Sequence, residues 1–369
     1  MKKILGILLI VAMLCTGSAL AIGSNYTVTA QTHVGNFGRE PLTFTISGLT
    51  EEEAAGVTAE DFVITGDFIN PANTVEGTDD VTAVEYKDGQ LILTVAGFRY
   101  NPSNFVVTYT GASNANLTFT KADVAEVTTA IADDFQDLKL NEMFYRLYVP
   151  ADAEGPVPLV VWHHGGGSIG TGNEAQLVNL LGATPFIEKY GQVAVLAPQC
   201  QRYEDGTFQD WTALLEDIRT VITGLIEDGT VDANRIYGVG CSFGGHGVIM
   251  DAAYNRDLFC AINVQCPMIN GTNIPELLSL TDMGVYLTTA EHDGTLPYVP
   301  FDKMLMEALM KTNENAHIYV FSDEEMAAYG IGNSEGLTEQ QKGAEYHNSW
   351  VLSFNNEQGV MDWLWSQSK

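Results

Sequence analysis

The sequence predicts an all-β sandwich followed by an α/β domain, in which helices cover both faces of a mostly parallel sheet. Residues 22–125 contain short alternating runs such as YTVTAQTHV and QLILTVAGF, separated by polar turns, and this spacing is typical of a sandwich. Residues 126–369 alternate strand and helix patterns, as parallel sheets require. The chain has 369 residues, 46% of them hydrophobic, which is enough to build more than one packed core.

The first residues have the pattern of a targeting segment. Residues 1–21, MKKILGILLIVAMLCTGSALA, place two lysines before an apolar run that ends in Ala19-Leu20-Ala21. This order is typical of a secretory signal peptide. We therefore expect cleavage near Ala21 and a secreted protein, extracellular or periplasmic. No later segment has the roughly 20 apolar residues of a membrane span, so no membrane anchor is expected.

Residues 22–125 form the predicted sandwich, and its length of about 100 residues suits one immunoglobulin-like domain. Further strand patterns are LTFTISGL, DFVITGDF and NFVVTYTG, and only LTEEEAAG has a helical pattern. No cluster of residues in this part suggests catalysis. The domain is a candidate surface for carbohydrate binding or for a homo-oligomer.

The elements of the α/β domain follow in order. VPLVVWHH is continuously apolar, as expected for a strand buried on both faces. The other expected strands are MFYRLYVP, VAVLAPQ, RIYGVG, CAINVQCP, GVYLTTAEHD and AHIYVFSD, and the expected helices are AQLVNLLGATPFIEKYG, WTALLEDIRTVITGLIEDG, GGHGVIMDAAYN, PFDKMLMEALMKTN and a closing WVLSFNNEQGVMDWLWSQ. The connection 323–346 is unusually long for a compact domain, and we expect it to cover or shape the substrate pocket.

The composition excludes several classes of function. The chain has 17 Lys and Arg against 47 Asp and Glu, a net charge of −30, which would repel nucleic acid and anionic membranes. After the signal peptide four cysteines remain, and none forms a CxxC pair, so no metal site is indicated. A strand would hold Cys260 and Cys266 too far apart to bond to each other. We expect buried free thiols, with one longer-range disulfide as the alternative.

The pattern Gly-x-Ser-x-Gly, which marks the nucleophile of many hydrolases, occurs twice, around Ser168 and around Ser242. A nucleophile of this kind lies on a very tight turn between a strand and a helix. Ser242 has that context, because RIYGVG precedes it and GGHGVIMDAAY follows it. Ser168 lies in HHGGGSIGTGN, which has five glycines between positions 165 and 172 and is typical of a wide loop. We therefore choose Ser242 as the candidate nucleophile.

The glycine-rich loop has a use of its own, because ester cleavage creates a negative oxygen that backbone N–H groups can stabilise. One donor is expected from Phe243, the residue after the serine, and the other from a glycine loop after an earlier strand. We choose Gly166, with Gly167 next. The same loop contains a Gly-x-Gly-x-x-Gly dinucleotide pattern, but the following strand VAVLAPQC ends without the acidic residue that a nucleotide site needs. No cofactor is expected.

A serine needs a base, and the base needs an orienting acid, in the chain order Ser, acid, His. His347 lies in AEYHNSW, between the last strand and the last helix, where the base should be. His246, on the helix after Ser242, is expected to face packing. The acid should follow the strand GVYLTTA, and we favour Asp293 over Glu291 because it comes just past the strand, before a turn.

The stretches VVWHHGGG, GVGCSFGG, TTAEHDGTLPY and YHNSW resemble the motifs of α/β-hydrolase esterases. The similarity is to the branch related to polyhydroxybutyrate depolymerases, feruloyl esterases and so-called predicted peptidases, and it covers about residues 130–369. The front part resembles the immunoglobulin-like domain of certain bacterial carboxylesterases by pattern only. The resemblance implies that Ser242, Asp293 and His347 form a catalytic triad. One departure is His163, where such enzymes usually have an apolar residue.

These observations lead us to expect a secreted serine carboxylesterase that acts on small-molecule or oligomeric esters. A serine peptidase on small peptides is the alternative within enzymes, and a binding or adhesion protein with a degenerate hydrolase domain is the alternative outside them. Candidate substrate-binding residues are His164, Gly167 and Trp211. Trp211 and Tyr203, on the loop QRYEDGTFQDW, are expected to be exposed aromatic residues that contact a sugar or phenolic group, with a role in packing as the equal alternative. Cys241, beside the serine, is expected to point into the core.

Overall fold

The computed structural model describes residues 23, 25–70, 73–97, 105–112, 116–297, 300–333 and 335–369. The predicted signal peptide lies outside these residues. The chain divides into two compact units. The first comprises residues up to 32, 41–68 and 74–128, and the second comprises 129–369 together with the short segments 33–40 and 69–73.

The first unit consists of two sheets that face each other. Five strands lie in the order β5-β6-β2-β1-β9, and four in the order β4-β3-β7-β8. Phe44 on the first sheet packs against Phe105 and Phe119 on the second, with ring centroids 5.5 and 5.2 Å apart. The elements are β1 (Thr27–Gly35), β2 (Gly38–Ser47), α1 (Glu51–Ala54), β3 (Phe62–Asn70), β4 (Asn73–Asp79), β5 (Val81–Lys87), β6 (Gln90–Val95), β7 (Phe105–Tyr109), β8 (Phe119–Thr120) and β9 (Val124–Thr129).

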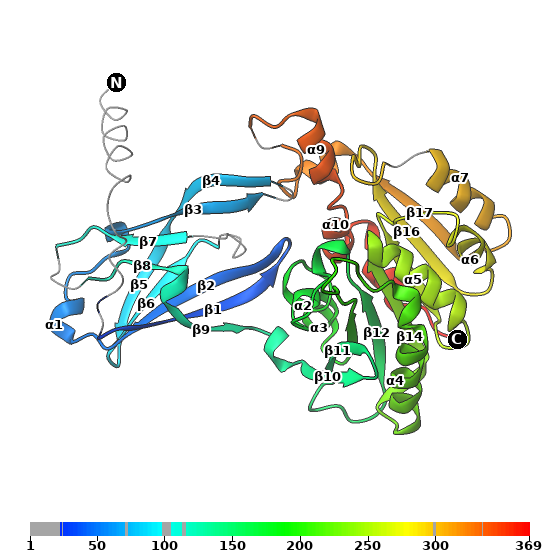
Figure 1. Cartoon of the computed structure of the whole chain (residues 1–369), viewed down its shortest axis with the longest axis horizontal. Helices are drawn as coiled ribbons and strands as arrows, with labels where there is room; N and C mark the ends of the chain where they lie inside the picture. Colours follow the sequence, from blue (N-terminus) through cyan, green and yellow to red (C-terminus); the bar gives the residue numbers. More distant parts are fainter. Residues whose placement is uncertain are drawn as a thin grey trace. The chain divides into compact units, whose positions relative to one another are not determined.

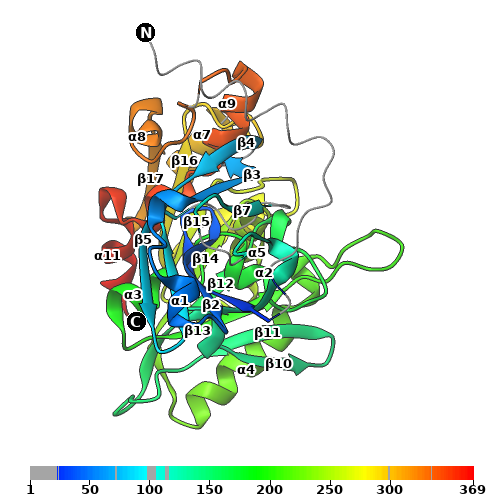
Figure 2. The same ribbon diagram turned by 90° about the vertical axis from the view of Figure 1, so that its left-hand side faces the viewer.

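The second unit contains an eight-stranded sheet in the order β10-β11-β13-β12-β14-β15-β16-β17, which Figure 2 follows from one edge to the other. The strands β10 and β11 run antiparallel at one edge, and the strands from β13 to β17 are parallel. The strands are β10 (Gln136–Leu140), β11 (Met143–Tyr148), β12 (Val157–His163), β13 (Ala194–Gln199), β14 (Val231–Cys241), β15 (Ala261–Gln265), β16 (Gly284–Ala290) and β17 (Ala316–Phe321).

Helices cover both faces of this sheet. The helices are α2 (Ala175–Val178), α3 (Pro185–Tyr190), α4 (Leu215–Glu227), α5 (Phe243–Tyr254), α6 (Ile274–Ser279), α7 (Pro300–Leu309), α8 (Asp323–Ala327), α9 (Glu339–Tyr346), α10 (Trp350–Phe354) and α11 (Val360–Trp365). The side chains of β12 alternate between two cores. Leu159 and Val161 pack with α4, α5, α6 and α7, which Figure 1 shows along one side of the sheet, whereas Val160 and Trp162 pack with α2, α3, α10 and α11.

Three sequence-based predictions about helices were wrong. The expected single helix AQLVNLLGATPFIEKYG is divided into α2 and α3, and the expected closing helix is divided into α10, a 3₁₀ turn and α11. The connection 323–346 is not a long loop, because it contains α8 and α9.

Within the described residues, Cys200, Cys241, Cys260 and Cys266 are free and buried, as expected. Burial raises the pKa of the Cys241 thiol to about 12, so this cysteine beside Ser242 is unreactive.

Candidate active site

Ser242 forms the junction between β14 and α5. The strand ends at Cys241 and the helix begins at Phe243, so a single residue makes the whole turn. Its backbone has φ 57° and ψ −118°, a positive φ that costs a non-glycine residue about 1–3 kcal/mol. Residues held in such conformations cluster at active sites. The predicted strand-turn-helix elbow is therefore present at Ser242.

Glycines on either side make this turn sterically feasible. A Cβ atom at Gly240 would lie 2.1 Å from the carbonyl oxygen of Gly244, and one at Gly244 would lie 1.8 Å from that of His163. Real Cβ atoms do not approach oxygen so closely. The elbow helix can therefore pack against the ends of β14 and β12 only with glycine at both positions.

Asp293 and His347 are brought together from different parts of the chain. Asp293 follows β16, and His347 lies at the C-terminus of α9. The Nδ1 atom of His347 lies 2.6 Å from Oδ2 of Asp293, and the Asp293 side chain is fully buried. Its other oxygen, Oδ1, accepts the N–H groups of Thr295 and Leu296, both at 2.9 Å.

This arrangement orients the imidazole. Since Nδ1–H donates to the Asp293 carboxylate, Nε2 is the basic nitrogen of the neutral ring. The ring also packs edge-on against Trp350, with centroids 5.7 Å apart, which restricts its rotation. The pair therefore has the geometry of a general base held by a carboxylate. The alternative acid, Glu291, is exposed.

The glycine-rich loop lies directly against the elbow. A Cβ atom at Gly165 would be 3.6 Å from Cβ of Ser242. The loop continues as a short 3₁₀ helix, Gly166–Ser168, in which Gly166 and Gly167 are exposed and have open space around them. Phe243 is the first residue of α5, so its N–H has no acceptor within the helix. The candidate oxyanion donors thus come from two adjacent segments.

Ser168, the serine of the second Gly-x-Ser-x-Gly pattern, is completely buried. Its hydroxyl has no hydrogen-bond partner and cannot reach a substrate in solvent. Ser242, and not Ser168, therefore remains the candidate nucleophile.

Two predictions about substrate contacts need correction. His164 is fully buried, and both of its ring nitrogens are engaged, because Nδ1 donates to the carbonyl of Gly165 at 2.7 Å and Nε2 accepts the N–H of Cys200 at 3.0 Å. Burial lowers its pKa to about 4. His164 therefore positions the glycine loop and has no atom left for a substrate.

Trp211 was expected to be exposed and is instead completely buried. Its ring packs against His163, His164 and Phe243, with centroids 4.8, 5.0 and 6.2 Å apart. The Trp211 ring therefore packs against both the glycine loop and the elbow helix. The exposed aromatic residues of this loop are Tyr203, as expected, and Phe208. Phe208 was missed because nothing in the sequence separates it from the buried Trp211.

His246 faces packing, as expected. It is nearly buried, its Nδ1 accepts a hydrogen bond from Asn273 at 3.0 Å, and its Nε2 lies 3.7 Å from Asp210. The nearby His246 imidazole holds the pKa of the Asp210 carboxyl below its usual value. Asp302 on α7 is a further residue that the sequence analysis missed. Burial, with a contribution from the Asp293 carboxylate, raises the pKa of the Asp302 carboxyl to about 7. The sequence analysis missed this residue because an acidic residue in an amphipathic helix pattern is normally expected on the surface.

The comparisons with known proteins concern the fold. No family model and no curated protein matches the chain. Among solved structures, a thermostable esterase is 20% identical, covers 93% of this chain and 100% of its own, and has a TM-score of 0.69. The second unit has the α/β-hydrolase fold.

Two further solved structures match about three fifths of the chain. A putative dienelactone hydrolase from Klebsiella pneumoniae subsp. pneumoniae MGH 78578 is 16% identical, covers 60% of this chain and 97% of its own, and has a TM-score of 0.41. Est1E from Butyrivibrio proteoclasticus is 17% identical, covers 61% and 98%, and has a TM-score of 0.39.

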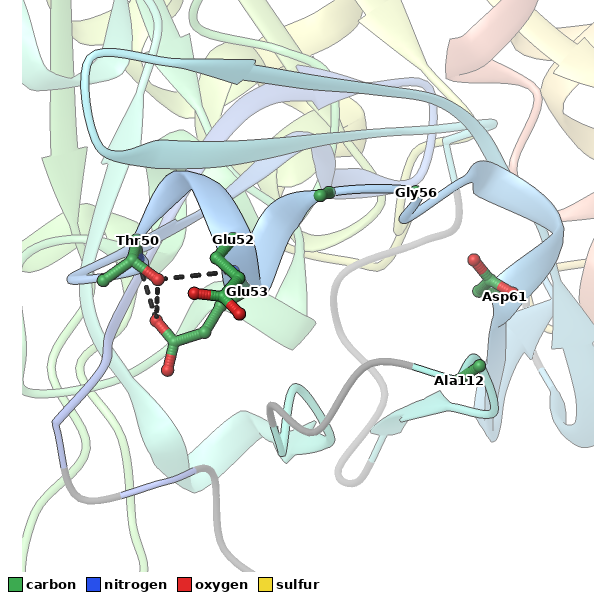
Figure 3. A pocket seen from close by; sticks show the side chains of 7 residues that line it. Thr50, Glu52, Glu53, Gly56, Asp61 and Ala112 are labelled. Carbon is green, nitrogen blue, oxygen red and sulfur yellow. Dashed lines mark hydrogen bonds between the residues drawn. The ribbon is translucent and has the colours of Figure 1, made fainter.

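The first unit contains an open pocket of about 600 Å³ around α1, shown in Figure 3. Its carboxylates include Glu53, which caps α1 through Thr50 at 2.9 Å and accepts the hydroxyl of Tyr26 at 2.9 Å, and Asp61, which bonds Thr58 at 2.8 Å. The pocket is lined by Thr50, Glu52, Glu53, Ala55, Gly56, Asp61 and Ala112. Since this lining holds no serine, cysteine or histidine, the candidate site remains at Ser242.

The described residues contain neither a candidate membrane span nor a candidate metal cluster. Within that part of the chain, no helix combines the length and the apolar composition needed to cross a bilayer. No group of three or more His, Cys, Asp or Glu side chains in the same residues is arranged to hold a metal ion.

Proposed function

We propose that this protein is a serine carboxylesterase that cleaves its substrate through an acyl-enzyme. The observation that carries the proposal is the 2.6 Å contact between Asp293 and His347 in a domain that also holds Ser242 on a strained elbow. A buried carboxylate that orients a histidine, together with a serine on a sharp turn, is the arrangement that activates a hydroxyl as a nucleophile. The α/β-hydrolase fold is compatible with this chemistry but does not specify it.

In the proposed reaction, Oγ of Ser242 attacks the ester carbonyl carbon while Nε2 of His347 takes the hydroxyl proton. The Asp293 carboxylate stabilises the resulting imidazolium. The carbonyl oxygen becomes negative in the tetrahedral intermediate and is bound by the N–H groups of Phe243 and Gly166. When the intermediate collapses, the C–O bond to the alcohol breaks and His347 returns the proton to the leaving oxygen.

The second half of the reaction repeats these steps with water. Nε2 of His347 removes a proton from water, which attacks the acyl carbon, and the same N–H groups stabilise the second tetrahedral intermediate. Collapse then releases the carboxylic acid and restores the Ser242 hydroxyl. Each oxyanion donor contributes a few kcal/mol to such a transition state.

The test is the activity of Ser242→Ala. We expect this variant to lose hydrolysis of p-nitrophenyl acetate and labelling by a fluorophosphonate probe, whereas Ser168→Ala, which alters a buried serine, should still be labelled. Full hydrolysis by Ser242→Ala would disprove the proposal. A non-catalytic protein would show no labelling of the wild type.

Ester and amide cleavage use the same residues, so the substrate class needs its own experiment. A panel of acetyl, butyryl, octanoyl and feruloyl esters, compared with small peptide amides, would separate the esterase from a peptidase. We expect kcat/KM to be higher for the esters. We also propose that the protein is secreted, which the N-terminal sequence and mass of the exported protein would test, with cleavage expected near Ala21.

A further inference from the structure

A buried histidine-carboxylate pair lies beside the proposed catalytic residues and is not used in the reaction. His163 is the last residue of β12, and Asp251 belongs to α5. The Nε2 atom of His163 lies 2.9 Å from Oδ2 of Asp251, and both side chains are completely buried.

Further hydrogen bonds fix the Asp251 end of the pair. Its other oxygen, Oδ1, accepts Nδ2 of Asn255 at 2.7 Å. Asn255 also donates to the carbonyl of Leu215 at 3.0 Å and accepts from Arg219 at 3.2 Å. Both carboxylate oxygens are therefore hydrogen-bonded, and α5 is tied to α4. A buried carboxylate with this many partners is held in one orientation.

The His163 end lies between the segments that build the site. Nδ1 of its ring lies 3.4 Å from the carbonyl oxygen of Val239 on β14, the strand that leads to Ser242. Its own carbonyl meets Gly244 in the first turn of α5 at a distance that excludes any Cβ atom. Figure 1 shows β12, β14 and α5 next to one another. One side chain thus contacts β14 and α5, while its backbone continues into the glycine loop.

The two proposed oxyanion donors lie on the two segments that this pair connects. Gly166 comes three residues after His163 on the glycine loop, and Phe243 begins the helix that carries Asp251. A hydrogen bond is directional, whereas apolar packing tolerates sliding, so the pair fixes how the end of β12 lies along α5. The spacing of the donors depends on that arrangement.

We propose that His163 and Asp251 are positioning residues that set the distance between the glycine loop and the nucleophile elbow. The inference rests on the proposed esterase function, because it assigns the pair a role in the same oxyanion site. Neither residue contacts the substrate or the reacting atoms. A displacement of about 1 Å between catalytic groups can reduce a rate about 100-fold, which sets the size of the effect to be measured.

The experiment compares His163→Leu with the conservative His163→Gln, whose amide N–H can still donate to Asp251. Using p-nitrophenyl acetate, we expect His163→Leu to lower kcat about 100-fold with KM changed less than about threefold, because the defect is in the transition state. His163→Gln should recover at least tenfold of this loss. The rate of fluorophosphonate labelling, which also needs the oxyanion donors, should fall in parallel.

A double variant separates positioning from the cost of an unpaired buried charge. His163→Leu combined with Asp251→Leu removes both partners, which proteins often tolerate without loss of stability. We expect the double variant to fold and to have the same low kcat as His163→Leu. If His163→Leu does not fold, the kcat of the double variant alone tests the positioning role. A folded double variant with the wild-type kcat would overturn the proposal.

Asn313 supplies a matched structural control. It is a buried polar residue that donates to the carbonyls of Leu280 and Met283 at 2.7 and 2.8 Å, and it precedes β17, at the opposite end of the parallel sheet from Ser242. Asn313→Ala should lower Tm and leave kcat unchanged. An equal loss of kcat in this control would show that the effect of His163 is only destabilisation. Retained activity in Ser242→Ala would instead refute the esterase function itself.

Discussion

At the scale of single residues, the candidate site depends on contacts that determine which nitrogen carries a proton. Asp293 accepts two backbone N–H groups through Oδ1 and the Nδ1–H of His347 through Oδ2. Both oxygens of its carboxylate are therefore occupied, one by the backbone of Thr295 and Leu296 and the other by the imidazole. The neighbouring Glu291 is exposed and has no such contacts to the ring. These two acids, two residues apart, provide a direct test of the assignment.

Replacing Asp293 by Asn should lower kcat by about 10⁴ while changing KM little, because the amide favours the wrong tautomer of His347. The matched variant Glu291→Gln should keep wild-type kcat. Steady-state kinetics with p-nitrophenyl butyrate at pH 8 would measure both. The assignment of the acid is wrong if Glu291→Gln carries the loss and Asp293→Asn does not.

His164 predicts a dependence of stability on pH. Burial lowers its pKa from 6.5 to about 4 in the folded protein, so the unfolded chain binds more protons between these values. Its contribution to stability is present above about pH 6.5 and is lost as the pH falls toward 4, and the shift corresponds to about 3 kcal/mol in full.

The measurement is the free energy of urea unfolding between pH 4 and pH 7.5 for the wild type and His164→Gln. Since other titrating groups are common to both proteins, the difference between the two curves isolates His164. We expect the wild type to lose about 3 kcal/mol more than the variant over this range. Parallel curves would show that His164 does not titrate as its burial requires.

At the scale of elements, the approach of α5 to β12 allows no side chain at Gly244. A Cβ atom there would lie 1.8 Å from the carbonyl oxygen of His163, so Gly244→Ala must push the helix away from the strand. We expect loss of activity and destabilisation of more than about 3 kcal/mol, as for other severe overpacking. Urea unfolding and esterase assays would measure both effects.

Gly224 offers the opposite case in a helix of the same domain. It lies within α4, is exposed, and has nothing within 4 Å of the position that a Cβ atom would occupy. Gly224→Ala should therefore stabilise the protein by about 1 kcal/mol through helix propensity and leave activity unchanged. If Gly224→Ala destabilised the protein as Gly244→Ala does, the space around each glycine would not explain the effect of the substitution.

The elements that could be predicted from sequence are those whose signals are local. A run of buried strand residues, a glycine-flanked serine and a following helix pattern identify the elbow at Ser242 without knowledge of the fold. The mostly parallel sheet and its cover of helices on both faces follow from the alternation of strand and helix patterns. Asp293 and His347 were predicted as partners from their order along the chain, and the structure places them 2.6 Å apart.

The elements that could not be predicted depend on distant contacts. The helix pattern between residues 175 and 190 is interrupted because Gly182 lies against the ring of Trp162, where a Cβ atom would be 2.2 Å away, and Pro185 begins a new helix. The closing helix is interrupted where Asn356 and Gln358 adopt positive φ. Asn often ends helices in this conformation, but Gln rarely adopts it, so the sequence marks only part of this break.

The same limit applies to the candidate site. Trp211 and Phe208 lie three residues apart in one polar loop, yet the first is fully buried and the second is half-exposed. Sequence periodicity does not predict which side chains of such a loop are buried. Their burial depends on whether they pack against the elbow and the glycine loop. The His163–Asp251 pair was missed for a related reason, since its members lie 88 positions apart.

At the scale of the whole molecule, the dominant property is the net charge of −30. A negative field of this size attracts cations and repels anions, and this effect on encounter rates is screened by salt over about 10 Å at 0.1 M. The proposed reaction also builds a negative oxygen, but local N–H donors stabilise it at short range. The global field should therefore act on substrate capture and leave the chemical step unaffected.

This separation can be measured with two esters that share a p-nitrophenyl leaving group, a neutral butyrate and a negatively charged hemisuccinate. For the anionic ester we expect kcat/KM to rise several-fold as NaCl increases from about 10 to 200 mM, because screening removes the repulsion. For the neutral ester kcat/KM should stay within about 1.5-fold, since it carries no charge on which the field could act. Equal salt dependence for both esters would mean that salt acts on the enzyme itself, and a falling rate for the anionic ester would show a local positive site that overrides the field of the whole chain.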